Sequence, residues 1–141
     1  MKFKVEVERV REVIEVVGRQ PQVLAVFDEL FRGTNSIERI AAGRAIARHL
    51  AASGGLFLLA THDHELARLA EEDAADGVVA WHFGDDVVDG TLHFSYALQP
   101  GVSRAHNAIR LLEEAGYPSA IVSRARAEAG QRMGGLPVDE G

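Results

Sequence analysis

We expect the chain to fold in the α/β class, with parallel strands joined by helices. Two observations predict this class. Short continuous apolar runs alternate along the chain with longer segments of helical periodicity, and residues that favour turns separate them. In addition, 47% of the 141 residues are hydrophobic and 26% are charged, which is typical of a folded chain rather than a disordered one.

The first helix is expected over residues 3–17. Apolar side chains recur there at heptad spacing and would form one face, and Gly18 and Pro21 then end the helix. The apolar run that follows, residues 23–27, is continuous, as expected for a strand that is buried on both faces.

A second helix is expected over residues 37–52. Asn35 precedes it as a capping residue, Glu38 stands three positions later as in a capping box, and Gly54 and Gly55 follow its end. Residues 56–60 form a second short apolar run, and a further helix is expected near residues 64–72. The order strand, helix, strand implies two parallel strands with a right-handed crossover.

Two more strands are expected over residues 78–83 and 91–98. The region from Gly84 to Gly90 would be the turn between them, so that they form a hairpin at the edge of the sheet. Aromatic residues alternate along both segments, and we expect them to pack in the core and along that edge; they are Trp81, Phe83, Phe94 and Tyr96.

Two helices are expected to complete the domain, over residues 104–115 and 119–129, separated by Gly116-Tyr117-Pro118. Residues 130–141 contain too few apolar side chains to pack, and we expect them to form a flexible tail. The predicted domain therefore covers residues 1–129.

Composition excludes several classes of protein. The chain contains no cysteine, so disulfides and thiolate metal sites are ruled out, in keeping with a reducing compartment. The first ten residues alternate charge with valine, unlike a signal peptide, and no apolar run reaches the length of a membrane span. We therefore expect a cytoplasmic protein that does not contact membranes. The net charge of −6 argues against nucleic-acid binding by this segment alone.

Polar residues follow the two predicted parallel strands directly. Asp28 and Glu29 end the first strand, and Thr61 and His62 end the second. Because parallel strands present their carboxyl ends at one edge, these four side chains should lie together. One carboxylate can hold Mg²⁺, directly or through water, its neighbour can orient and deprotonate a water, and an imidazole can sense or stabilise a transferring phosphoryl group.

The same histidine permits a different interpretation. His62 and His64, with Asp63 between them, are spaced as in metallohydrolases that bind zinc or iron through histidine. Leu66 and Ala67 stand where such a site needs an aspartate and another histidine, which makes this alternative the weaker one. Arg124 and Arg126 are interpreted as a solvated helix face rather than as a DNA contact.

Three segments together resemble one family. They are VLAVFDELFRGTNSIERIAAGRAIARHL, LFLLATHDHEL and LQPGVSRAHNAIRLLEEAGYPSAIVSRA, in this order. They are similar to the carboxyl-terminal half of the ATPase domain of the MutS family of DNA mismatch-repair proteins, in the branch whose turn reads Gly-Thr-Asn-Ser. The resemblance runs from about residue 3 to residue 129. It implies part of a P-loop NTPase sheet of the ABC type, with ATP and Mg²⁺ as cofactors that this chain alone is not expected to bind tightly.

The resemblance also implies roles for individual residues. The segment 23–29 corresponds to the Walker B strand, with Asp28 serving Mg²⁺ through water, Glu29 positioning the attacking water and His62 facing the γ-phosphate. The loop that contacts the nucleotide site of the opposite subunit would be Gly33, Thr34, Asn35 and Ser36. Family ATPase domains pair head to tail, and the ATP cycle drives a DNA-bound clamp elsewhere in the protein.

One family feature is missing from these 141 residues. No Gly-x-x-x-x-Gly-Lys-[Ser/Thr] loop precedes the strands, although such a loop holds the phosphates in the family. We therefore expect half of an ATPase domain that is inactive alone. It would be a fragment, a gene remnant or one piece of a split protein, and it would form a homo-oligomer or join a partner that carries the Walker A half. DNA contact would require further domains. The alternative is a non-catalytic dimerisation or interaction module derived from that domain.

Overall fold

The computed structural model describes residues 2–72, 77–103 and 107–134, with side chains described up to residue 131. The chain divides into two compact units, Met1–His82 with Pro100–Val102, and Phe83–Gln99 with Ser103–Gly141. The proposed domain boundary at residue 129 stays a prediction.

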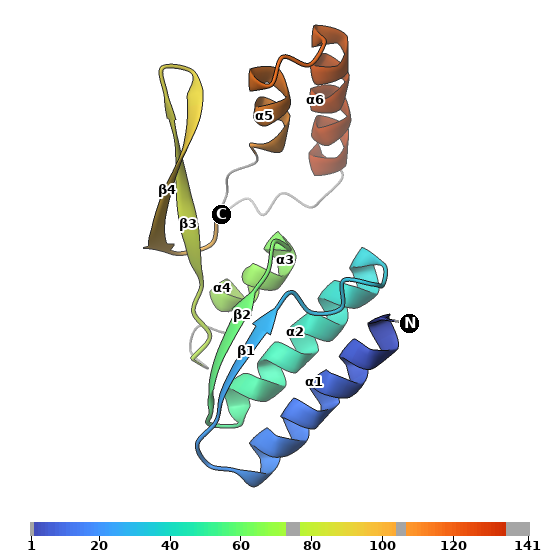
Figure 1. Cartoon of the computed structure of the whole chain (residues 1–141), viewed down its shortest axis with the longest axis vertical. Helices are drawn as coiled ribbons and strands as arrows, with labels where there is room; N and C mark the ends of the chain where they lie inside the picture. The colour runs from blue at the N-terminus through green and yellow to red at the C-terminus, as the bar shows by residue number, and fades with distance from the viewer. Residues whose placement is uncertain (1, 73–76, 104–106, 135–141) are drawn as a thin grey trace. The chain divides into compact units, whose positions relative to one another are not determined.

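The first unit alternates helices and strands as the sequence predicts (Figure 1). Strands β1 (Leu24–Asp28) and β2 (Leu56–Ala60) pair in parallel, with Leu24 opposite Leu56 and Asp28 opposite Ala60. This confirms the predicted parallel pair. The helices of the unit are α1 (Lys2–Arg19), α2 (Ser36–Ala52), α3 (His64–Ala67) and α4 (Leu69–Glu72).

Helices α1 and α2 pack on one face of the two strands. In β1 the side chains of Ala25 and Phe27 are buried, because they point toward both helices. Leu50 of α2 is also buried, and Gly43 lets α2 approach α3 closely, since a Cβ there would lie 3.2 Å from a methyl group of Leu66. The buried residues of this core are Val10, Val17, Ala25, Phe27, Leu30, Phe31 and Leu50.

The opposite face of the two strands is exposed. We call it the open sheet face, and it consists of Leu24, Val26, Leu56 and Leu58, which are 56–67% exposed. The expectation that the first strand is buried on both faces is therefore wrong for β1. Both packing helices lie on the same side of the strands, so alternate residues face solvent despite the continuous apolar run.

The helix ends follow local hydrogen bonding. Asn35 caps α2 as predicted, because its side-chain oxygen accepts the Glu38 N–H at 2.9 Å; the Glu38 carboxylate in turn accepts from the Asn35 side-chain amide rather than from its backbone. The single helix expected over residues 64–72 is instead two short helices. Only Arg68 separates them, and its backbone dihedrals stay close to those of a 3₁₀ turn, so the difference is a local shift in hydrogen bonding.

Within the described part of the chain, strands β3 (Trp81–Val88) and β4 (Thr91–Pro100) pair only with each other and form a separate two-stranded sheet. The expected placement of this hairpin at the edge of the β1–β2 sheet is therefore wrong. The expected turn over residues 84–90 is also wrong, because β3 continues through Gly84 to Val88. Asp89 and Gly90 make the turn, both with positive φ, as a two-residue type I′ turn requires.

The aromatic side chains of the hairpin are exposed. Phe83 is 67% and Tyr96 is 83% exposed, and Trp81 and Phe94 are at least half exposed. The expected core packing is therefore wrong for these four side chains, whereas Leu92 of β4 is buried. Phe94 and Tyr96 contact each other instead, with ring centroids 6.4 Å apart.

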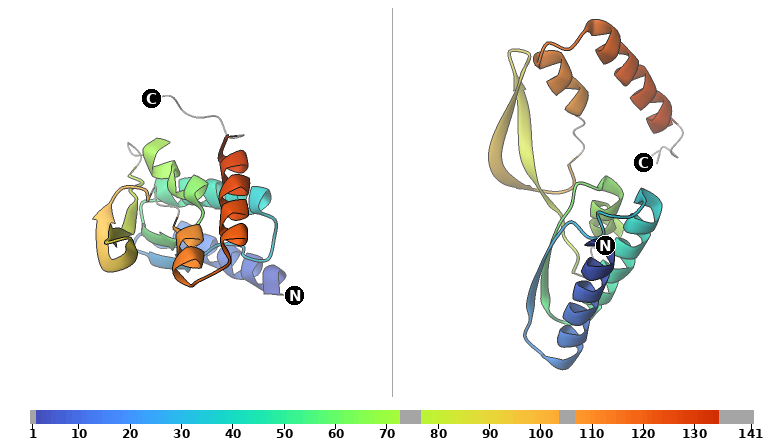
Figure 2. Two further views of the ribbon diagram at one scale, coloured as in Figure 1. Left: turned by 90° about the horizontal axis from the view of Figure 1, so that it is seen from above. Right: turned by 45° about the vertical axis from the view of Figure 1, so that its right-hand side comes forward.

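In the second unit, helices α5 (Ala108–Glu114) and α6 (Ser119–Gly134) follow the hairpin and are joined by a short turn (Figure 2). The Leu92 N–H donates to the Glu114 carboxylate at 2.7 Å, which connects β4 to α5. Helix α6 extends five residues into the region expected to be a tail, because Gly130 is accommodated within it. Residues 104–106, where a helix start was expected, and 135–141 lie outside the described residues.

None of the described helices has both the length and the apolar character that a membrane span requires.

Candidate functional site

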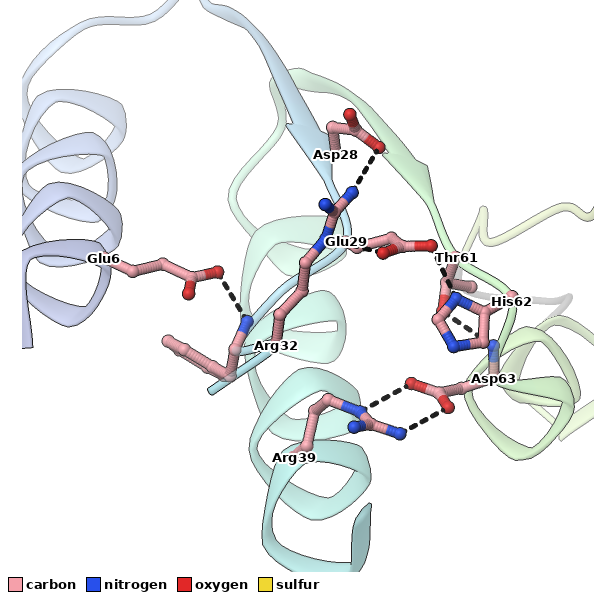
Figure 3. A network of polar contacts seen from close by, with 9 residues as sticks. Glu6, Asp28, Glu29, Arg32, Arg39, Thr61, His62 and Asp63 are labelled. Atoms are coloured by element: carbon pink, nitrogen blue, oxygen red, sulfur yellow. Dashed lines mark hydrogen bonds and ion pairs between the residues drawn. The ribbon is translucent and has the colours of Figure 1, made fainter. Parts of the chain in front are cut away.

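Strands β1 and β2 end side by side, and their pairing continues one residue further, because the Glu29 N–H donates to the Ala60 carbonyl at 2.8 Å. We call the residues that leave the strands at this edge the acidic rim, namely Asp28, Glu29, Thr61 and His62 (Figure 3). The predicted convergence of these four residues is therefore found in the structure.

The Glu29 carboxylate is held from two sides. Its Oε1 lies 2.5 Å from Nδ1 of His62, and its Oε2 lies 2.6 Å from Nε of Arg32. Its side chain is 25% exposed, whereas that of His62 is 72% exposed. Glu29 and His62, the two residues predicted to be catalytic, are thus in contact, and the Arg32 side chain, which the sequence did not indicate, also contacts Glu29.

These contacts set the charge of Glu29. The hydrogen bond from His62, assisted by the positive charge of Arg32, lowers the pKa of the Glu29 carboxyl, although partial burial opposes this. Glu29 is therefore an anion at neutral pH, able to accept a hydrogen bond from water. Because a lower pKa also makes a weaker base, this environment favours orienting a water over removing its proton.

Asp28 has a more open environment. Its side chain is 81% exposed, and an oxygen lies 3.6 Å from the Arg32 guanidinium. An exposed carboxylate of this kind suits Mg²⁺, which usually keeps several waters and takes only one or two carboxylates from a protein. The residues of the acidic rim therefore fit the metal and water side of a nucleotide site.

The loop after β1 adopts an uncommon backbone conformation. Glu29 has φ 53° and Phe31 has φ 60°, in the left-handed region that side chains other than glycine rarely occupy. Phe31 is anchored to α1 on both its side chain and its backbone. Its ring lies edge-on to that of Phe3 at 5.8 Å, and its N–H donates to the Glu6 carboxylate at 2.6 Å. Such anchoring can maintain strain at a site.

The four loop residues predicted to contact nucleotide lie next to the acidic rim but make different contacts. A Cβ at Gly33 would lie 3.1 Å from Cβ of Phe3, so only glycine passes α1 easily. Thr34 and Asn35 both donate to the Glu38 carboxylate. Ser36 begins α2 and lines a groove of about 460 Å³ along that helix. Neither Glu29 nor His62 lines this groove.

An ion pair that the sequence did not reveal supports His62. The Arg39 guanidinium of α2 donates two hydrogen bonds to the Asp63 carboxylate, at 3.0 and 2.8 Å, and both side chains are largely buried. The bond to Asp63 raises the pKa of Arg39. The Asp63 N–H also donates to Thr61 Oγ at 3.0 Å. These bonds fix the turn that carries His62. No sequence signal joined the two residues, because they lie 24 positions apart on different elements.

The alternative sites gain no support from the part of the chain that is described. A metal site needs several converging ligands, and no group of three or more His, Cys, Asp or Glu residues comes together within it. Arg124 and Arg126 form exposed ion pairs with Glu128 and Glu113. They thus behave as residues of a solvated helix face.

A family model and several individual proteins that match this chain all point to the same family. A family model described as MutS domain V matches residues 1–132. DNA mismatch repair protein MutS 2 of Haloarcula marismortui is 30% identical over 88% of this chain, which covers 13% of that relative. DNA mismatch repair protein MutS of Sorangium cellulosum is 33% identical over 89% of the chain, covering 13% of it. The corresponding protein of Anaeromyxobacter dehalogenans is 34% identical over 99% of the chain, covering 15% of it. The chain thus spans a small part of the length of these relatives.

Proposed function

Because this chain belongs to the MutS family, whose domain V it matches, we propose that it supplies the metal and water side of a MutS-type ATPase site that acts in DNA mismatch repair. The observation that carries this proposal is the acidic rim, where Glu29 and His62 lie 2.5 Å apart beside Asp28. The fold would be part of a P-loop NTPase sheet.

Three residues of the acidic rim have distinct roles in this proposal. Asp28 would hold Mg²⁺ through water, Glu29 would orient the attacking water, and His62, which contacts the Glu29 carboxylate from its other side, would act on the γ-phosphate. When bound, Mg²⁺ would neutralise charge on the phosphates. The Arg39–Asp63 pair holds the turn after β2, so that the His62 ring stays within hydrogen-bond distance of Glu29.

The groups that hold the phosphates must come from elsewhere. The two lysines of the sequence, Lys2 and Lys4, lie at the start of α1 and not in a glycine-rich loop. We therefore propose that a segment carrying the Walker A loop completes the site and that this chain turns over little ATP alone. The loop 33–36 would face the nucleotide of a second ATPase domain, and DNA would be contacted through other family domains.

Complementation tests the proposal directly. The chain is mixed with a separately expressed polypeptide that carries the Walker A half of a MutS ATPase domain, and ATP turnover is measured. We expect turnover that neither polypeptide shows alone and that Glu29→Gln abolishes. The matched control is Glu15→Gln, on the exposed side of α1, which should leave turnover unchanged. Turnover that survives Glu29→Gln would contradict the role of Glu29.

The open sheet face favours a second function, that of an interaction module without catalysis. Four aliphatic side chains on one face are well suited to bind another apolar layer. In that case the two polypeptides would associate, but ATP with Mg²⁺ would leave the melting temperature of their complex unchanged. A rise in melting temperature on adding ATP and Mg²⁺ would favour the ATPase.

A further inference from the structure

Arg32 lies between the two carboxylates of the acidic rim (Figure 3). Its Nε is 2.6 Å from Oε2 of Glu29, and one of its terminal nitrogens is 3.6 Å from Oδ1 of Asp28. We propose, building on the proposed function, that Arg32 is a positioning residue that takes the place of the divalent cation while the site is empty and moves away when the cation binds.

The charges at the rim lead to this inference. A guanidinium that contacts both carboxylates compensates their charge and repels a second cation at the same position. It also occupies Oε2 of Glu29, while His62 holds Oε1. Once Arg32 leaves, Oε2 becomes free, and the carboxylate stays oriented through Oε1. While Arg32 stays in place, it therefore takes up one of the positions at which Glu29 could accept a hydrogen bond from water.

The exchange requires only a side-chain movement. Arg32 is 62% exposed, and exposed ion pairs are weak, so its contacts break readily. The backbone beside it is fixed, because Phe31 packs on Phe3 and donates its N–H to Glu6. The left-handed backbone at Glu29 and Phe31 turns the chain so that Arg32 returns to the strand end that it follows. The loop can thus stay in place while the guanidinium swings into solvent.

Manganese binding to the nucleotide-free chain tests the proposal. Free Mn²⁺ is measured by electron paramagnetic resonance during titration of the wild type, Arg32→Ala and Arg32→Gln. We expect both variants to bind Mn²⁺ about two- to fivefold more tightly, because the competing cation is gone. The control is Arg11→Ala. Arg11 is exposed to a similar extent and forms an ion pair with Glu15 on α1, at 3.3 Å, so its loss should leave Mn²⁺ binding unchanged.

Asp28→Asn separates the role of Arg32 from the metal site itself. The substitution is introduced into the wild type and into Arg32→Gln, and Mn²⁺ binding is measured in both. If it weakens Mn²⁺ binding in both and removes the gain from Arg32→Gln, the proposal is supported. If it weakens binding but Arg32→Gln binds like the wild type, the role of Arg32 is overturned and the metal site stands. If it has no effect in either background, Asp28 does not hold a divalent cation in the nucleotide-free chain, which overturns the role of Arg32, and the proposed function is then decided by the complementation experiment. Melting temperatures without metal show that each variant is folded.

Discussion

Replacing Phe27 by alanine should destabilise the chain far more than replacing its neighbour Val26 by threonine. The two residues are adjacent in β1 but lie on opposite faces: Phe27 is 8% exposed and Val26 is 67% exposed. The comparison therefore tests whether the helices cover one face of the strands only, which is the arrangement on which the open sheet face depends.

The expected magnitudes follow from these exposures. Truncating a buried phenylalanine to alanine costs about 3–5 kcal/mol, and at its exposure Phe27→Ala should lower the free energy of unfolding by about 3 kcal/mol. Full burial of a valine stabilises by about 1.5 kcal/mol, and Val26 buries about a third of its surface, so Val26→Thr should cost about 0.5 kcal/mol or less. At about 4 °C per kcal/mol, the melting temperatures should fall by about 12 °C and by no more than about 2 °C.

Urea unfolding provides the measurement. Circular dichroism at the helical minimum follows α1 and α2, and Trp81, which belongs to the same unit, provides a fluorescence signal. The reasoning would be refuted if Val26→Thr lowered the free energy of unfolding by about 2 kcal/mol or more, because Val26 would then be buried in the folded protein. A small effect of Phe27→Ala would likewise contradict the packing of α1 and α2 on that side.

Three further outcomes are expected. The lowered pKa of Glu29 stabilises the fold above the pKa of this carboxyl in the unfolded chain, and that stabilisation disappears as the pH falls through the folded pKa. The stability difference between wild type and Glu29→Gln should therefore be largest near neutral pH and shrink steadily in thermal scans as the pH falls below the ordinary pKa of a glutamate carboxyl, whereas a difference that does not change with pH would contradict the assignment. In a double-mutant cycle measured by urea unfolding, the effects of Arg39→Ala and Asp63→Ala on stability should be strongly coupled, whereas those of Arg11→Ala and Glu15→Ala, in an exposed pair, should be nearly additive. Equal coupling for both pairs would argue against a stabilising role of the Arg39–Asp63 ion pair. The double variant Val26→Thr, Leu58→Thr should reduce self-association in sedimentation velocity while lowering the melting temperature far less than Phe27→Ala does, and unchanged self-association would show that copies of the chain meet through another surface.

Local sequence signals predicted the elements of the first unit to within a few residues. Heptad spacing located α1, the Asn35 cap located α2, and the two apolar runs located β1 and β2. What covers each face could not be read from these signals, since a continuous apolar run looks the same whether one face or both are packed. The hairpin turn was placed too early because the whole region from Gly84 to Gly90 was interpreted as the turn, whereas Asp89-Gly90 is the stronger two-residue signal.

The candidate site could be predicted in outline only. The convergence of Glu29 and His62 follows from parallel strands alone, because their carboxyl ends share one edge. The contacts of Arg32 and Arg39 depend on loop conformation and on side-chain direction, which spacing does not encode. The roles of the site residues in catalysis stay predictions until complementation is measured.

Phe31 must adopt a left-handed backbone conformation and also fill a buried position with its ring, and few residue types suit both. A backbone with φ 60° favours glycine or asparagine, while the contact with Phe3 and the burial of the ring favour a large aromatic side chain. A saturation library at this codon should therefore yield two separate groups of functional clones, one small and flexible and one aromatic. Valine and isoleucine, which disfavour this backbone conformation and lack an aromatic ring, should be rare among these clones.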